Sequence, residues 1–157
     1  MVLPDVKPST YIKTPITSGL FGGHDVNEGW FMSNVRILIV DDKQLVRDGL
    51  RIFLESHDGM TICGEAADGL EGIRKAFELK PDVILLDLSM PTLDGLKAAQ
   101  LIREGSPKAK ILIVTSCHSL EAARITAEVG ASGYVTKSLI TSHLVPAIEE
   151  AVSRHAA

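Results

Sequence analysis

Short, continuous runs of apolar residues alternate with amphipathic stretches from residue 35 to the end of the chain. Three runs, at 35–40, 83–86 and 111–114, are apolar almost throughout. Such runs are typical of parallel strands that helices cover on both faces. Weaker runs at 60–66 and 133–136 predict two further strands, so we expect five strands in all.

Between these runs, apolar residues recur at spacings of three and four, which is the periodicity of a helix with one buried face. The clearest stripe is in the last segment and contains Leu144, Ala147, Ile148, Ala151 and Val152. A second stripe contains Leu70, Ile73 and Phe77. Five strand–helix units joined by right-handed crossovers predict an α/β fold with a doubly wound parallel sheet, in which ligands bind beyond the carboxyl ends of the strands.

Residues with special backbone preferences indicate where the helices begin and end. Gly105, followed by Ser-Pro, is expected to end the third helix, and Gly130 to end the fourth in a left-handed conformation. Thr141 or Ser142 can cap the last helix, which would place Pro146 near its first turn.

The first 33 residues are rich in Pro, Gly, Ser and Thr, and their apolar residues show neither the pattern of a strand nor that of a helix. We therefore expect a flexible extension at 1–33 and a compact domain at 34–155. The Trp30-Phe31 pair is either a docking element or part of an arm packed on its own domain or on a neighbour.

Charge and cysteine content exclude several classes of function. The chain has 157 residues, 16 of them basic and 20 acidic, and its net charge is −4 without a basic run, so direct DNA binding by this chain is not expected. Cys63 and Cys117 form no CxxC pair, so a redox or zinc site is not expected. No apolar stretch approaches the roughly 18 residues that span a bilayer. We expect a cytoplasmic protein with no membrane contact.

Polar residues that can carry chemistry stand where the predicted strands end. Asp41 and Asp42 follow the first strand, Asp87 the third, Thr115 closes the fourth and Lys137 follows the fifth. An acidic pair before a helix is, by itself, more often a solvated helix start. However, the carboxyl ends of parallel strands share one edge of the sheet, so these five residues are expected to converge.

Three neighbouring carboxylates repel one another by about 1 to 4 kcal/mol per pair at ~4 Å, so they require cations. Mg²⁺ (or Mn²⁺) prefers oxygen ligands, and Lys137 supplies a second positive charge. With both present, a carboxylate can attack phosphorus and form an aspartyl phosphate. Asp87 is our candidate nucleophile, and the alternative is that Asp87 is a metal ligand only.

Four short stretches match a known family in residue type, order and spacing. They are VDD ending at Asp42, LDLSMP from Leu86 to Pro91 with Asp94 and Gly95, IVTS ending at Ser116, and GYVTK ending at Lys137. This pattern resembles the receiver domain of bacterial two-component response regulators over residues 35 to 153. The stretches LVRDGL, from Leu45, and GEAADG, from Gly64, resemble the NarL/FixJ (LuxR-type) subfamily.

The resemblance implies a flavodoxin-like sheet with strand order 2-1-3-4-5 and a role for each site residue. Asp42 would bind Mg²⁺ directly, Asp41 directly or through water, Asp87 through a carboxylate oxygen and Ser89 through its backbone carbonyl. Lys137 would pair with the phosphate. Thr115 would close on the phosphoryl group through its hydroxyl, and Tyr134 would change rotamer. Ser116 is small and would leave room for the phosphate.

The resemblance also implies partners. A sensor histidine kinase or phosphotransfer protein would donate the phosphoryl group, and a homodimer is one assembly that it allows. The protein would be a phospho-acceptor switch with Mg-dependent self-phosphorylation and autodephosphorylation, rather than an enzyme. The expected output is transcription regulation through a DNA-binding domain missing after residue 157; the alternative is a stand-alone receiver that signals by protein contact.

Other readings of the site fit the sequence less well. A phosphatase of the haloacid-dehalogenase type would need a second Asp two residues after Asp87, where the chain has Ser89. A nucleotide-binding protein would need a glycine-rich loop after the first strand, and neither GxxxxGK[ST] nor GxGxxG is present there. A receiver that binds partners without phosphorylation would not need every acidic, hydroxyl and lysine position.

Overall fold

The computed structural model of the chain describes residues 11–12, 31–32, 34–90, 95–116 and 119–154. Two short strands, β1 (Tyr11–Ile12) and β2 (Phe31–Met32), pair antiparallel. Most of the predicted extension at 1–33, including Trp30, lies outside the described residues, as do Pro91 and Asp94 of the sequence motifs and Cys117.

Five parallel strands form the main sheet, as the sequence predicts. The chain enters the sheet at its second position, moves to one edge, returns past the first strand and then continues outward. This is the order 2-1-3-4-5 in the numbering of the five units. Across the sheet, the strands are β4 (Met60–Ala66), β3 (Val35–Val40), β5 (Val83–Leu86), β6 (Lys110–Thr115) and β7 (Gly133–Thr136).

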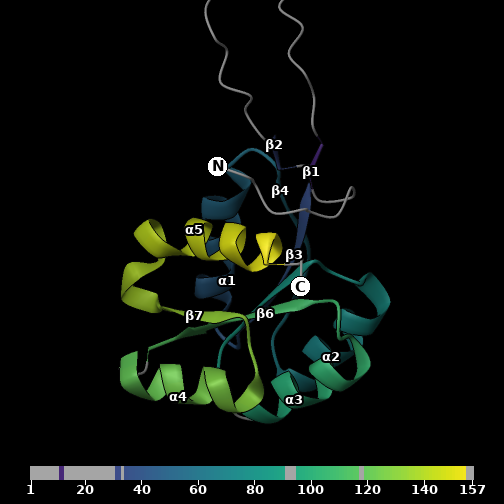
Figure 1. The fold of residues 1–157 in the computed structure, drawn as a ribbon, viewed down its shortest axis with the longest axis vertical. Coiled ribbons are helices and arrows are strands. Elements are labelled where there is room, and N and C mark those ends of the chain that lie inside the picture. Colours follow the sequence, from purple (N-terminus) through teal and green to yellow (C-terminus); the bar gives the residue numbers. More distant parts are fainter. Residues whose placement is uncertain (1–10, 13–30, 33, 91–94, 117–118, 155–157) are drawn as a thin grey trace, which may run out of the picture.

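Helices cover both faces of this sheet (Figure 1). On one face, α1 (Gln44–Glu55) and α5 (Ile140–Ser153) pack on alternate residues of the strands, among them Ile37 and Leu85. On the other face, α2 (Gly69–Leu79), α3 (Gly95–Gly105) and α4 (Ser119–Val129) pack on the residues between, such as Leu38 and Ile84. Burial on both sides explains why these strands have continuous apolar sequences.

The stripe predicted for α5 is buried except for Ala147, which is half-buried against the same core, but the stripe predicted for α2 is wrong in part. Leu70 is 60% exposed and Phe77 is 43% exposed, whereas Gly72 and Ala76 form the buried face of α2. A Cβ at position 72 would lie 2.9 Å from Cγ1 of Val40. Because the helix approaches the sheet closely through these small residues, its bulky side chains are left at the flanks.

The helix ends follow the predictions for α3 and α4 but not for α5. Helix α3 ends at Gly105, and Gly130 adopts φ 63° after α4. Helix α5 begins at Ile140, directly after a 3₁₀ turn, η1 (Lys137–Leu139). The turn already starts the helical path, so no side-chain cap is needed and Pro146 lies in the helix interior.

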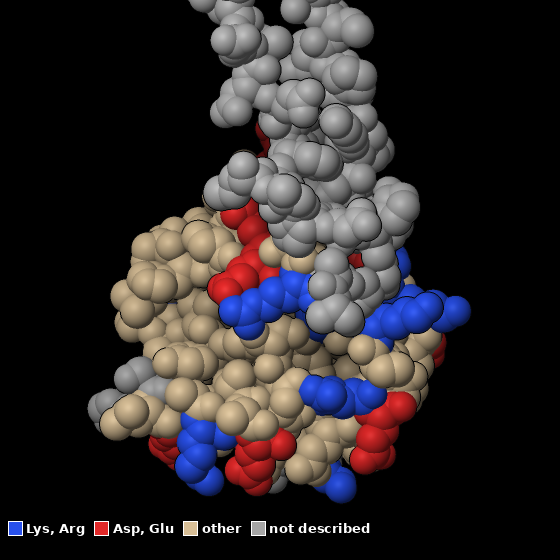
Figure 2. Space-filling view, viewed as in Figure 1, with Lys and Arg blue, Asp and Glu red and all other residues tan. Residues whose placement is uncertain are grey.

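Charged side chains are mixed in sign on the face shown in Figure 2, where blue and red alternate along the lower edge near α3 and α4. Ion pairs within helices account for part of this pattern, for example Arg124 with Glu128 at 3.5 Å. Among the described residues, no helix has both the length and the apolar character needed to cross a membrane.

We predict that Leu144→Ala will lower the free energy of unfolding by about 2 to 5 kcal/mol, because Leu144 is fully buried between α5 and the sheet. Leu120→Ala is the matched control, since Leu120 is 86% exposed, and should change it by less than about 0.5 kcal/mol. Urea unfolding followed by circular dichroism measures both. Equal effects of the two substitutions would contradict the assignment of the core.

Candidate functional site

The acidic pair lies at the point where β3 passes into α1. The backbone N–H of Asp41 donates to the carbonyl of Ala66 at 3.1 Å, which extends the pairing of β3 with β4 by one residue. Oδ1 of Asp41 accepts the N–H of Lys43 at 2.8 Å, and Asp41 is only 2% exposed. This local hydrogen bond turns the chain into α1 and fixes the carboxylate. Asp42 follows and is half-buried.

Asp87 occupies the equivalent place after β5. Its N–H donates to the carbonyl of Val40 at 2.9 Å, so Asp87 is held beside the end of β3. Its Oδ1 accepts the N–H of Ser89 at 3.2 Å, and the residue is 2% exposed. Both carboxylate positions therefore follow from backbone pairing at the edge of the sheet.

Gly95, the first residue of α3, packs against the backbone of Asp87. Its N–H donates to the carbonyl of Leu88 at 3.1 Å, and a Cβ at position 95 would overlap the carbonyl oxygen of Asp87. Only glycine permits this close approach. The start of α3 thus holds the strand end that carries Asp87.

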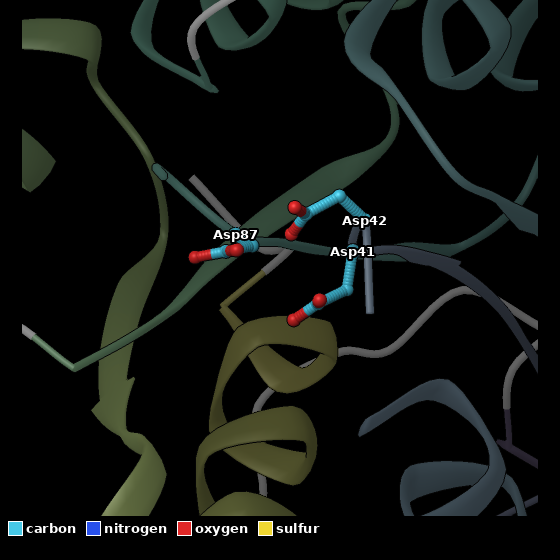
Figure 3. A group of neighbouring side chains, drawn as sticks. All are labelled: Asp41, Asp42 and Asp87. Carbon is cyan, nitrogen blue, oxygen red and sulfur yellow. The ribbon is translucent and has the colours of Figure 1, made fainter. Parts of the chain in front are cut away.

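The carboxylates of Asp41, Asp42 and Asp87 lie close together, and Figure 3 shows their side chains as neighbours at the ends of the strands. One oxygen from each lies within 4.8 Å of the others. At such distances the charges repel strongly in a partly buried environment. The convergence expected from the sequence is therefore present.

Lys137, the first residue after β7, brings an ammonium group into this cluster. Its Nζ lies 2.9 Å from Oδ2 of Asp41 and 3.5 Å from Oδ2 of Asp87. The contact with Asp41 is a close ion pair. At the longer distance, Oδ2 of Asp87 is buried without a hydrogen bond. Oδ1 of Asp42 is also buried without a hydrogen bond.

The pKa values of Asp87 and Lys137 are raised. Burial raises the pKa of Asp87, and the neighbouring Asp41 charge adds to this effect, while the Ser89 N–H and Lys137 oppose it. Burial would lower the pKa of Lys137, but hydrogen bonding to Asp41 and the charges of both carboxylates outweigh it. The ammonium is therefore favoured, whereas the Asp87 carboxylate remains incompletely compensated.

The residues present fit a hard divalent cation. A cluster of three carboxylates offers the oxygen ligands that Mg²⁺ prefers. Two of its buried oxygens have no hydrogen-bond partner, and such oxygens are costly unless a cation or donor reaches them.

The remaining predicted residues lie at or near the same edge. Thr115 is fully buried at the end of β6, next to β5, and Ser116 is exposed just beyond it. Ser89 is exposed beside Asp87. Tyr134 lies further back in β7, opposite Ile113, and packs with the core on the face of α2, α3 and α4. The structure thus brings Lys137 into the acidic cluster but keeps Tyr134 at a distance along its strand.

The sequence analysis assigned no role to Arg47 or Glu65, which lie near the acidic pair. Arg47 of α1 donates from Nη1 to the carbonyl of Asp41 at 2.8 Å, and its Nε contacts Glu65 of β4 at 3.3 Å. In the sequence, Arg47 is part of the LVRDGL stretch, but nothing in its spacing indicates a contact with Asp41.

The family model described as the response regulator receiver domain matches residues 37–149. The chain belongs to this family. The acidic cluster of this receiver is of the kind at which receiver domains generally bind Mg²⁺.

Relatives of this receiver include the response regulator GacA of Pseudomonas viridiflava, 40% identical over 114 residues, which are 73% of this chain and 53% of the relative. The transcriptional regulatory protein LiaR of Bacillus subtilis is 39% identical over 117 residues, 74% of this chain and 56% of LiaR. The chain therefore spans about half the length of the curated relatives it matches.

Solved structures agree with the fold of this receiver. A LuxR-family two-component response regulator from Aurantimonas is similar with a TM-score of 0.73 and 40% identity, covering 77% of this chain and 86% of that one. The response regulator domain of Thermotoga maritima CheB gives a TM-score of 0.71 and 32% identity, covering 76% and 96%. The prediction of a LuxR-type receiver is confirmed.

Neutralising Asp87 should stabilise the receiver when divalent cations are removed. We predict that Asp87→Asn, at pH 7 with EDTA, will raise the free energy of unfolding by about 1 kcal/mol, because it removes a poorly compensated buried charge. Because the pKa of Asp87 is raised on folding, protonation favours the folded wild type, so the difference should shrink as the pH falls toward that pKa. Urea unfolding at several pH values measures it.

The control is Asp58→Asn, because Asp58 is exposed. Its effect should stay within about 0.5 kcal/mol at every pH. An Asp87→Asn protein that is less stable than the wild type in EDTA would contradict the account of the cluster.

Proposed function

We propose that this receiver is a phosphorylation switch in which Asp87 accepts the phosphoryl group. The observation that carries the proposal is the environment of Asp87: a buried carboxylate with one oxygen held by the Ser89 N–H and the other without a hydrogen bond. It lies in a cluster with Asp41 and Asp42, and its Oδ2 is 3.5 Å from the Lys137 ammonium. The family assignment supports this role.

The metal would be Mg²⁺ (or Mn²⁺), held by the carboxylates of Asp41, Asp42 and Asp87 and by the backbone carbonyl of Ser89. When bound, this cation offsets the negative charge of the carboxylates and of the phosphoryl oxygens. Support comes from the clustering of the three carboxylates and from the buried oxygens of Asp42 and Asp87 that lack partners.

In the transfer step, a carboxylate oxygen of Asp87 attacks phosphorus while the bond from phosphorus to the donor breaks. With a phosphohistidine donor, a phosphorus–nitrogen bond breaks and the imidazole takes up a proton as it leaves. The Lys137 ammonium, already 3.5 Å from Asp87, would hold a phosphoryl oxygen. Water later hydrolyses the aspartyl phosphate, so the chemistry is self-phosphorylation and autodephosphorylation rather than turnover of a separate substrate.

The switch would begin with the hydroxyl of Thr115 closing on the phosphoryl group, for which the small Ser116 leaves room. Tyr134 would couple this movement to the surface formed by α4, β7 and α5. Helix α4 supports the idea because only Ala122 and Val129 are buried among its described side chains. So little buried area makes its docking easy to bias. A nearly complete switch would need a bias of about 5 kcal/mol.

The phosphoryl donor would be a sensor histidine kinase or a phosphotransfer protein, and the protein would act in the cytoplasm. We propose that the complete protein regulates transcription through a second, DNA-binding domain. The relatives support this, because LiaR is a transcriptional regulatory protein and this chain covers only 56% of it. Residues 34–155 would be the receiver, and residues 1–33 a flexible extension.

Phosphoryl transfer can be tested by intact-mass measurement. After treatment with acetyl phosphate and Mg²⁺, the wild type should gain the mass of one phosphoryl group, and Asp87→Asn should gain none. The matched control, Asp58→Asn, removes an exposed carboxylate elsewhere and should be labelled like the wild type. Omitting Mg²⁺ should abolish labelling. Equal labelling of Asp87→Asn and the wild type would show that another residue is the acceptor.

A further inference from the structure

Arg47 lies on α1, one turn beyond the acidic pair, but its side chain is not a solvated surface group. It is 14% exposed, and its Nη1 donates to the backbone carbonyl of Asp41 at 2.8 Å. Charged side chains are rarely buried to this extent without defined partners. The contact therefore fixes both the guanidinium and the carbonyl.

Glu65, the second-last residue of strand β4, holds Arg47 from the other side. Its Oε2 lies 3.3 Å from Nε of Arg47, and its other oxygen, Oε1, contacts Arg51. Because the guanidinium is planar, a carboxylate at Nε and a carbonyl at Nη1 together restrict its orientation. Arg47 thus links α1, β4 and the loop that carries Asp41 and Asp42.

The position of the Asp41 carbonyl matters because the peptide group joining Asp41 to Asp42 is planar. Fixing this carbonyl oxygen restricts the orientation of that peptide group, while the preceding group is held separately, because the Asp41 N–H donates to the carbonyl of Ala66. The direction in which the Asp42 side chain leaves the backbone is restricted with it. One hydrogen bond can therefore influence both acidic ligands.

We propose that Arg47 is a positioning residue for the metal site: through the Asp41 carbonyl, it holds the acidic pair in the arrangement that binds Mg²⁺. This inference rests on the proposed function, because it assumes that the carboxylate cluster binds the cation. Arg47 would not contact the cation itself. Groups that orient metal ligands in this way commonly change metal affinity by about 10- to 100-fold when removed.

The direction in which Mg²⁺ affinity changes when Arg47 is replaced distinguishes a positioning role from a purely electrostatic one. A guanidinium near the site repels a divalent cation, so removing its charge alone would tighten Mg²⁺ binding. Loss of positioning has the opposite effect and weakens binding. Glu65 already offsets part of the positive charge, which favours the positioning effect.

Arg51 provides a matched control within the same helix. It shares the partner Glu65 with Arg47, but its further contact is with Asp48 rather than with the Asp41 carbonyl. Arg51→Gln removes one positive charge and one ion pair to Glu65, as Arg47→Gln does. Only Arg47→Gln removes the hydrogen bond to Asp41.

The experiment is isothermal titration calorimetry of Mg²⁺ into the wild type, Arg47→Gln and Arg51→Gln, with each protein shown to be folded by circular dichroism. We expect the Kd of Arg47→Gln to rise about tenfold and that of Arg51→Gln to stay within about twofold of wild type. An Arg47→Gln protein that binds Mg²⁺ as tightly as the wild type, or more tightly, would overturn the inference. A wild type without measurable Mg²⁺ binding would instead overturn the proposed function, and this inference with it.

If Arg47→Gln does not fold, Arg47→Lys takes its place. Lysine keeps the charge but cannot donate in two fixed directions at once. The Kd should then rise by roughly threefold or more, because the positive charge is retained and only the geometry is lost. An unchanged Kd in this variant would also refute the positioning role.

Discussion

Mutual repulsion among three clustered carboxylates, of which those of Asp41 and Asp87 are buried, is the constraint around which this receiver is arranged. Asp41 and Asp87 are held by backbone hydrogen bonds at the ends of adjacent parallel strands, so they cannot separate without breaking the sheet. Lys137 reaches Asp41 at 2.9 Å and Asp87 only at 3.5 Å. The fold therefore keeps mutually repelling carboxylates together at the carboxyl edge of the sheet, and a nearby positive charge lowers this repulsion.

In this receiver, a rigid sheet occurs together with a peripheral helix, α4, that is packed through few side chains. Strands covered on both faces, with Gly95 seated on the Asp87 backbone, keep the carboxylates in place. Helix α4, by contrast, buries few of its described side chains. On the proposed function, a phosphoryl group adds close to two negative charges at one fixed point, and the periphery is the part that can respond. Arg47 would belong to the rigid part, since it ties the acidic pair to α1 and β4.

The strands were predictable almost to the residue, because continuous apolar runs have few alternatives in an α/β chain. The convergence of Asp41, Asp87 and Lys137 was also predictable, because it follows from the topology of the sheet. The buried face of α2 was not predictable, since the close approach through Gly72 depends on Val40 across the interface. The start of α5 was misplaced because η1 begins the helical path before any capping residue. The contact from Arg47 to Asp41 joins two elements, and a one-dimensional pattern contains no sign of it.

We propose that the strand ends of this receiver form one cation site. Mn²⁺ can replace Mg²⁺ in such oxygen-lined sites, and its unpaired electrons broaden the NMR signals of nearby nuclei. In a titration of the ¹⁵N-labelled protein with Mn²⁺, broadening should appear first at the amides of Asp42, Leu88 and Ser89 and decline with distance from them. Broadening centred on another acidic group, such as Glu71 and Glu78 of α2, or spread evenly over the surface, would contradict the claim.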